Sequence, residues 1–188
     1  MLVPQLVTPP AELPVSLEMA KEQAEIDFDD RDALIQAFIG AATAHLDGYS
    51  GILGRCLVSQ EWRQDFACWG TLRLPFPDVS SVEVSYIDAA GVRQTIDTAD
   101  YQIAAEPGGP VVRFVRRSYP AVFYDDVAPI SVTFQAGYGT AEDVPWSLRV
   151  AILQHAAAMF EYRESLADRI EPTGVYEMLI APYRWIRV

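Results

Sequence analysis

The stretch Ser131–Glu164, SVTFQAGYGTAEDVPWSLRVAILQHAAAMFEYRE, passes from a strand pattern to a helix pattern. The strand ends in the glycine turn Gly137–Tyr138–Gly139, and an acidic bend leads to Pro145. Proline suits the first turn of a helix, where its missing N–H is not needed. Apolar residues follow at helical spacings of three and four: Trp146, Val150, Leu153, Ala157 and Phe160. The stretch predicts a joint between a β-layer and a helical body.

The residues before this joint, 55–136, have the pattern of short strands separated by turns. Asp88–Gly91 is a hairpin turn, because Gly91 tolerates the positive φ that such turns need. We predict an antiparallel β-layer of about six or seven strands. The expected strands are Leu57–Phe66, Thr71–Leu74, Val79–Ile87, Val92–Ile96, Tyr101–Ala104, Val111–Val115 and Ile130–Gln135.

Helical patterns lie on both sides of this β-insertion. Ser16 can cap a short helix, Leu17–Ala24, and Asp29 or Asp30 can cap a longer second one. The order of segments predicts an α+β fold in one domain, a helical body with an inserted antiparallel β-layer. The expected segments are an extended arm (1–15), helices (16–54), the β-insertion (55–136), a helix (145–164) and a C-terminal docking segment (173–188).

Composition limits the classes of function. The chain has 188 residues, 51% of them hydrophobic, and a net charge of −12. Such acidity argues against tight binding of duplex DNA, which needs lysine and arginine at the phosphates. An acidic surface could still allow DNA to slide past without being bound. No apolar run approaches a membrane span. The proline-broken start lacks a basic signal region, so we expect synthesis in the cytosol.

An aspartate-rich segment and two cysteines are candidate metal ligands. Asp27, Asp29, Asp30 and Asp32 suggest a calcium loop, but an EF-hand needs glycine at its sixth position and glutamate at its twelfth. Asp32 and Phe38 stand there, so we expect the aspartates to favour a helix N-terminus instead. Cys56 and Cys68 are too few for a four-thiolate zinc site, and we expect both to be reduced and buried. We predict no metal and no cofactor.

Other groups could suggest catalysis or phosphate binding. His45 and His155 each lie in a predicted helix without a ligand or triad partner at suitable spacing, so we expect solvated or structural histidines. Gly137–Gly139 lacks both the P-loop lysine and a third glycine, so it indicates a turn. Glu161 and Glu164 share a helix face, but a solvated helix end is the simpler interpretation. We predict no catalytic residue.

Arg113, Arg116 and Arg117 form the densest basic patch of this acidic chain. They could meet a phosphate or an acidic neighbour, or they could pair with acids on the same sheet or on an adjacent subunit. The sequence alone leaves these alternatives open.

The last seven residues, PYRWIRV, concentrate the residue types that are enriched at protein–protein hot spots. A terminal segment so rich in aromatic residues should dock rather than remain free. It could dock on its own domain or on a partner, and the residues favour neither. The candidate partner-binding residues are Tyr183, Arg184, Trp185, Ile186, Arg187 and Val188.

Several motifs follow one another along the chain, each occurring once: SLEMAKEQAEID, DDRDALIQAFIGAATAHLDGYSG, RCLVSQEWRQDF, LRLPFPDVSSVEVSYIDAAG, VTFQAGYG, Val144–Pro145, FEYRE and APYR. From about Ser16 to Arg184 the chain thereby resembles the head–tail connector (adaptor) proteins of tailed phages, the gp6-like and phiE125 gp8-like group, which also occur in gene transfer agents. Leu57, Gln60 and Trp62 match the arginine–x–leucine–x–x–glutamine–x–tryptophan motif of that family. Tyr119–Pro120 departs from its usual Trp-Pro.

This resemblance implies a ring, usually of twelve copies, beneath the portal of a virion or gene transfer agent particle made in the bacterial cytoplasm. The implied partners are other copies, the portal protein, a stopper or tail-side protein, and DNA that passes through the lumen without specific binding; no membrane is implied. Family members pack their helical body against neighbours and reach the portal with the C-terminal segment. The family has no catalytic residues.

We therefore expect a structural connector that joins head to tail and extends the DNA channel, and not an enzyme. Two alternatives remain. A small hydrolase of unknown substrate would need a site assembled from distant residues, and the missing Ser/His/Asp pattern argues against it. A ligand-binding domain would need a closed apolar cavity, which the short, proline-bounded strands disfavour.

Overall fold

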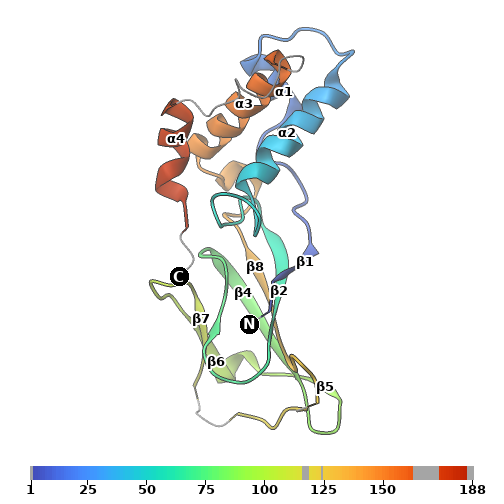
Figure 1. The fold of residues 1–188 in the computed structure, drawn as a ribbon, viewed down its shortest axis with the longest axis vertical. Coiled ribbons are helices and arrows are strands. Elements are labelled where there is room, and N and C mark those ends of the chain that lie inside the picture. Colours follow the sequence, from blue (N-terminus) through green and yellow to red (C-terminus); the bar gives the residue numbers. More distant parts are fainter. Residues whose placement is uncertain (1, 116–118, 124, 163–173, 186–188) are drawn as a thin grey trace. The chain divides into compact units, whose positions relative to one another are not determined.

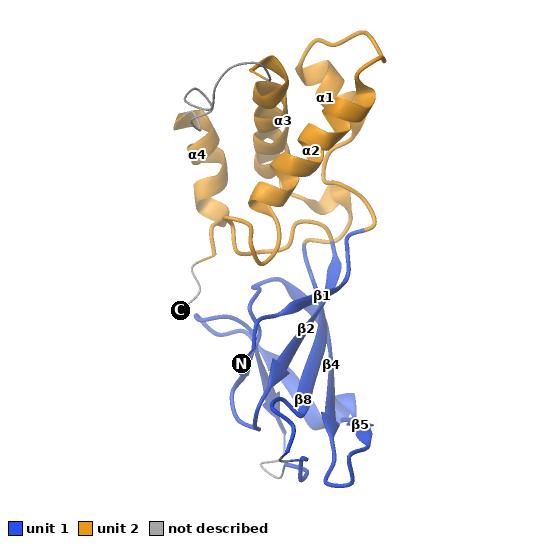
Figure 2. Cartoon of the chain, turned by 45° about the vertical axis from the view of Figure 1, so that its right-hand side comes forward, with its two compact units in different colours: residues 1–10, 59–137, 186–188 blue, residues 11–58, 138–185 orange. Residues whose placement is uncertain are grey.

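The structure, a computed structural model, describes residues 2–115, 119–123, 125–162 and 174–185. It confirms the α+β fold (Figure 1). Contacts divide the chain into two compact units, which Figure 2 colours separately. Residues 1–10, 59–137 and 186–188 form the β unit, and residues 11–58 and 138–185 form the helical unit.

Four helices lie in the described part of the helical unit: α1 (Leu17–Gln23), α2 (Asp32–Leu46), α3 (Trp146–Glu161) and α4 (Gly174–Ile180). Short 3-10 turns precede α3 at Ala141–Asp143 and follow α4 at Ala181–Tyr183. Helix α3 lies between α2 and α4 and packs on both, while α1 packs on α2 and α3 (Figures 1 and 2). Helices α2 and α4 therefore form the two flanks of the unit.

The helix starts agree only partly with the sequence. Ser16 caps α1 as predicted, since its Oγ accepts a hydrogen bond from the Met19 N–H at 3.2 Å. The predicted cap of α2 is wrong, because α2 begins after Arg31, which makes no side-chain cap. Asp29 and Asp32 instead accept hydrogen bonds from the Lys21 ammonium at 2.5 and 2.8 Å, which ties the start of α2 to α1.

The core of the helical unit lies where helices α1–α4 meet. Its fully buried large side chains come from α2, α3, α4 and the loop after α2: Ile39, Leu46, Leu53, Leu57, Leu148, Ile152 and Ile180. Each such side chain contributes about 1.5–3 kcal/mol relative to leaving it in water. The buried face of α3 is centred on Leu148 and Ile152. Trp146, which the spacing pattern places on the apolar stripe, is 65% exposed and does not belong to this buried face.

The β unit contains two antiparallel sheets. The five-stranded sheet has the order β1 (Gln5–Thr8), β2 (Gln60–Phe66), β8 (Ile130–Ala136), β4 (Val79–Ile87) and β5 (Arg93–Thr95). The three-stranded sheet has the order β3 (Leu72–Arg73), β7 (Val111–Phe114) and β6 (Tyr101–Ala104), and a 3-10 turn at Thr98–Asp100 precedes β6. The eight described strands thus form two sheets rather than one layer of six or seven strands. The extended N-terminal segment contributes the edge strand β1.

An aromatic core supports the larger sheet. Phe76 lies 5.0 Å from Trp62 on β2 and 6.1 Å from Phe134 on β8, measured between ring centroids. β2 and β8 pair in continuous register from Gln60 opposite Ala136 to Phe66 opposite Ile130. The side chains of β2 alternate between buried and half-buried, as expected of a strand with one face on the core.

The hairpin between β4 and β5 forms where the sequence predicts it. Gly91 has a φ of 79°, and the Asp88 Oδ1 accepts hydrogen bonds from the N–H groups of Ala90 and Val92 at 2.9 and 3.0 Å. The expectation for the cysteines is half wrong. Cys56 is buried, but Cys68 is exposed because β2 already ends at Phe66 and Cys68 lies in the bend that follows.

Replacing Phe134 by alanine should lower the free energy of unfolding by about 3–5 kcal/mol, because the change leaves a cavity beside Phe76. Chemical denaturation followed by tryptophan fluorescence measures the loss. The control is Val92→Ala at a 54% exposed position of the same unit, which should change stability little. Equal losses for the two variants would contradict the described core.

Candidate functional site

The predicted docking segment is described only in part. Tyr183 packs against the helical core, the Trp185 N–H donates to the Leu53 carbonyl at 2.7 Å, and Arg184 pairs with Glu177 at 2.8 Å. Ile186, Arg187 and Val188 lie outside the described residues. The described half of the segment therefore docks on its own helical unit, and docking on the portal stays a prediction.

The flank formed by α4 exposes apolar side chains. Val175 and Met178 are 56% and 76% exposed and stand three residues apart on one helix, so they share a face. The ion pair between Glu177 and Arg184 balances the charge beside them. We call Val175 and Met178 the α4 flank.

The opposite flank, formed by α2, is almost uncharged. Asp32 is the only Asp, Glu, Lys or Arg among the 15 residues of α2. A helix in water normally carries charged residues on its outer face, and one that is apolar all round is normally covered. We call its exposed apolar residues the α2 flank: Ala33, Leu34, Ala37, Ala41 and Ala44.

Trp146 and Arg149 form a stacked pair at the start of α3. The guanidinium carbon of Arg149 lies 4.1 Å from the centroid of the Trp146 ring. Arg149 is only 9% exposed, whereas Trp146 is 65% exposed and covers it. The pair was not predicted from the sequence. The sequence does contain one indication of it. Arg149 is the only Lys or Arg between residues 118 and 162, and it stands in an apolar run.

The structure brings together the two histidines, which the sequence could not pair. His45 on α2 and His155 on α3 lie 5.3 Å apart, edge to face, and His155 lies 5.7 Å from the ring of Tyr176 on α4. Burial lowers the pKa of His155, and the charge of His45 lowers it further. In the part of the chain that the structure describes, neither histidine hydrogen-bonds a serine or cysteine.

The basic patch proves to be partly neutralised. Glu106 accepts hydrogen bonds from Arg113 and from Arg73, the latter at 3.0 Å, and these arginines lower the pKa of Glu106. Of the alternatives that the sequence left open for Arg113, the structure shows pairing with an acid of the same unit. Arg116 and Arg117 lie outside the described residues.

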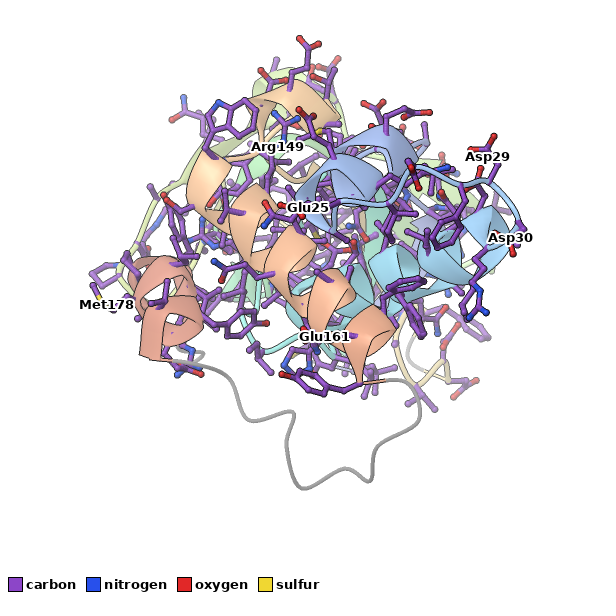
Figure 3. The ribbon with its side chains drawn as sticks, turned by 90° about the horizontal axis from the view of Figure 1, so that it is seen from above. Glu25, Asp29, Asp30, Arg149, Glu161 and Met178 are labelled. Carbon is purple, nitrogen blue, oxygen red and sulfur yellow. The ribbon has the colours of Figure 1, made fainter. Side chains whose placement is uncertain are left out.

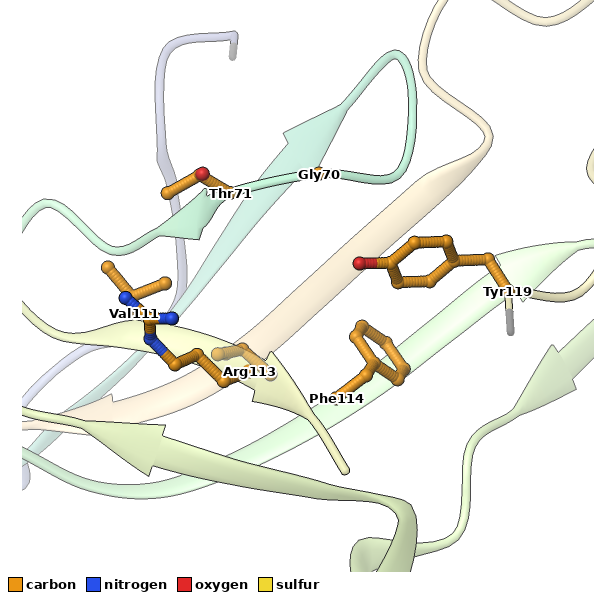
Figure 4. A pocket seen from close by; sticks show the side chains of 7 residues that line it. Gly70, Thr71, Val111, Arg113, Phe114 and Tyr119 are labelled. Atoms are coloured by element: carbon orange, nitrogen blue, oxygen red, sulfur yellow. The ribbon is translucent and has the colours of Figure 1, made fainter. Parts of the chain in front are cut away.

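A cavity of about 320 Å³ adjoins this patch. Arg113, Phe114 and Tyr119 line it, and the Arg113 side chain extends toward Val111 (Figure 4). The other lining residues are Gly70, Thr71, Val111 and Val112. The one charged side chain among its described lining residues, Arg113, is already paired with Glu106.

The remaining candidates are the acidic residues and the glycine motif before α3. Among the described residues, no three His, Cys, Asp or Glu side chains are placed to hold a metal ion. Glu161 is exposed, and Glu164 lies outside the described residues. Gly137 and Gly139 have φ angles of 133° and 135°, which confirms turn chemistry at that motif. No described helix is both long enough and apolar enough to cross a bilayer.

Comparison with known proteins finds the same fold in chains of gene transfer agent particles. The chain matches three solved structures over 100% of its own length and 97% of theirs. They are "Virion of native gene transfer agent (GTA) particle" (TM-score 0.79, 22% identity), "Neck of empty GTA particle computed with C6 symmetry" (0.79, 23%) and "Neck of native GTA particle computed with C12 symmetry" (0.75, 22%). No protein-family model and no curated protein matches the chain. At this identity the likeness shows a shared fold over the whole chain.

The half-buried His155 predicts a pH dependence of the helical unit. The pKa of His155 is lower in the folded than in the unfolded chain, so the unfolded chain binds the proton more readily. The free energy of unfolding should therefore fall as the pH drops below about 6.5, the ordinary histidine pKa, and level off below the folded pKa. Urea titrations between neutral and mildly acidic pH measure this.

The matched variants are His155→Phe and His45→Phe. The first should flatten the dependence in this range, because it removes the group whose pKa is lowered. The second should keep most of it, because burial is the larger cause of the shift and His45 the smaller one. An unchanged pH dependence in His155→Phe would contradict the assignment.

Proposed function

We propose that this chain is a structural subunit of the neck of a tailed-phage-like or gene transfer agent particle, where it forms a homo-oligomeric ring that connects head and tail. The observation that carries this proposal is the shared fold over the full length of chains from gene transfer agent particles, two of them from necks. Necks computed with C6 and C12 symmetry contain chains repeated around an axis, which supports a ring for this chain too.

The two flanks of the helical unit supply a physical basis for ring formation. Helices α4 and α2, which carry these flanks, lie on opposite sides of α3 (Figures 1 and 2). Both flanks are apolar, and neither can cover the other within one chain. A contact between two different surfaces generates a ring when the rotation closes. We infer that the α4 flank of one copy packs on the α2 flank of the next.

The shapes of the two flanks suit such a contact. The α2 flank consists mostly of alanines, and a Cβ at Gly40 on the same helix would meet no atom within 4 Å other than those of its chain neighbours and the helix backbone. Small side chains let a second helix approach to the short end of the usual range of about 8–10 Å between helix axes. Met178 offers a long, adaptable side chain for that surface.

Acidity and the C-terminal segment complete the proposal. A net charge of −12 suits a channel in which DNA slides, because an acidic wall does not hold phosphate. Residues 183–188 would dock on the portal protein, with Tyr183, Arg184 and Trp185 positioned by their contacts to the helical unit. A stopper or tail-side protein would bind the other face of the ring.

Met178→Glu should leave a folded chain but weaken assembly about 30-fold or more, because a carboxylate would be buried in an apolar contact at a cost of about 2 kcal/mol. Native mass spectrometry and electron microscopy of the purified protein, alone and with the portal, measure the assembly. Val127→Glu changes an equally exposed residue (77%) of the β unit and should assemble like the wild type.

A mixing experiment tests the head-to-tail geometry. Met178→Glu blocks the α4 flank and Ala37→Glu blocks the α2 flank, so each variant keeps one intact surface. An equimolar mixture should form dimers but no rings, whereas either variant alone should stay monomeric. Rings formed by both variants would contradict these flanks as the interface, and a wild type that stays monomeric beside the portal would contradict the ring.

Deletion of residues 186–188 tests docking on the portal separately. The described contacts of Tyr183 and Trp185 remain, so the shortened chain should fold and form rings but lose affinity for the portal protein. Co-sedimentation with portal rings measures the loss. Glu177→Gln, which removes the ion pair with Arg184 but leaves residues 183–188 unchanged, is the control for a purely structural effect. Undiminished binding by the deletion variant would contradict docking through these residues.

A further inference from the structure

We propose that Trp146 and Arg149 form a carboxylate-binding site that is completed by an acidic side chain of a second copy of this chain. The inference rests on the proposed ring and identifies the charged contact within it. The site lies on α3, in the helical unit, and uses neither the α4 flank nor the C-terminal segment.

The hydrogen bonds of Arg149 are largely unsatisfied. Its Nη2 has only the sulfur of Met19 as an acceptor, at 3.3 Å, and a thioether is a weak acceptor. Its Nε is buried without any partner. Among the described residues no carboxylate pairs with Arg149, although the chain has 26 acidic residues.

A buried guanidinium without a counter-charge is costly, and proteins pair such groups or place them against a ligand. Trp146 supplies a ring face for the cation but no hydrogen-bond acceptor. The donors of Arg149 suit a planar carboxylate, which can accept two hydrogen bonds from one guanidinium. The exposed Trp146 would become the aromatic wall of such a contact, and Trp and Arg are the residue types enriched at interface hot spots.

The acidic loop between α1 and α2 is the matching surface. Asp27 and Asp30 are exposed and form no ion pair with another described residue. Seen from above, Asp29 and Asp30 project on the side of the helical unit away from α4 and well apart from Arg149 (Figure 3). One chain therefore cannot bring its own loop to Arg149. In the proposed ring, the α4 flank of a neighbouring copy packs on α2 of this chain. The α3 helix of that neighbour would then face the side of this chain that carries Asp29 and Asp30.

Nucleic acid is the less suitable occupant. Glu142 and Asp143 are exposed within seven residues before Arg149, and they would repel a polyanion. The guanidinium is also nearly covered by Trp146, so it can accept a single side chain more readily than a phosphate backbone. A protein carboxylate fits both restrictions.

The variant Arg149→Lys tests the site by chemical cross-linking, because it places an amine where the guanidinium was. A water-soluble carbodiimide joins an amine and a carboxylate in direct contact into an amide, and the carbodiimide takes up the water released. An equal mixture of ordinary and ¹⁵N-labelled chains is treated and analysed by mass spectrometry. We expect peptides of mixed isotope content that join the introduced amine to an acid of residues 25–32. The control is Arg93→Lys, an exposed arginine of the β unit that lies outside the acidic loop.

Each outcome decides the proposal. Links within one chain, links to other acids only, or a yield no higher than the control would overturn it, as would loss of the link on adding a short DNA duplex. If the wild type forms rings but the Arg149→Lys chain gives no link from its introduced amine, this inference alone is overturned. A wild type that forms no ring would overturn the proposed function, and inter-chain links from the introduced amine in that sample would still support the site.

Arg149→Met separates binding from folding. It removes the buried unpaired charge but keeps an unbranched side chain, so the free energy of unfolding should stay equal or rise. The affinity between copies should fall about 30-fold or more. A less stable variant that assembles normally would show that Arg149 serves only the fold and would overturn the proposal.

Discussion

The helical unit depends on hydrogen bonds that join the segment before the β-insertion to the segment after it. Arg55 donates one of them to the hydroxyl of Tyr138, which lies 83 positions later in the sequence. The Leu57 N–H donates to the Asp47 carboxylate at 2.7 Å, and the Leu57 carbonyl accepts a hydrogen bond from the Tyr138 N–H at 2.9 Å. Val58 and Gly139 form an isolated parallel β-bridge. The strand-rich insertion therefore begins and ends at the same place. Because of this closure, helices from before and after the insertion can share one core.

Sequence patterns predicted the elements better than their pairing. α3 and the hairpin at Gly91 could be predicted because spacing and turn chemistry are local signals. The division into two sheets could not, because strand pairing joins residues far apart and β3 has only two residues. β1 gave no alternation signal since all four of its residues are exposed. The cap of α2 was misplaced because Asp29 and Asp32 bind Lys21.

The candidate site was harder to predict than the fold. Spacing placed Trp146 on an apolar stripe, and a stripe does not tell whether its own chain or a neighbour covers a given residue. The pairing of His45 with His155 depends on α2 and α3 lying side by side, which no local pattern encodes. The docking segment was found by composition alone, and composition does not name the surface it docks on.

The distribution of charge accounts for these features together. Copies with a net charge of −12 each repel one another, most strongly within the roughly 8 Å over which salt leaves charges unscreened. A surface on which copies meet must therefore exclude acids or neutralise them. α2 carries one carboxylate in 15 residues, and the α4 flank stands beside a balanced ion pair. Among the described residues, no carboxylate pairs with Arg149, and the proposed site would use this unpaired charge to attract a carboxylate of a second copy.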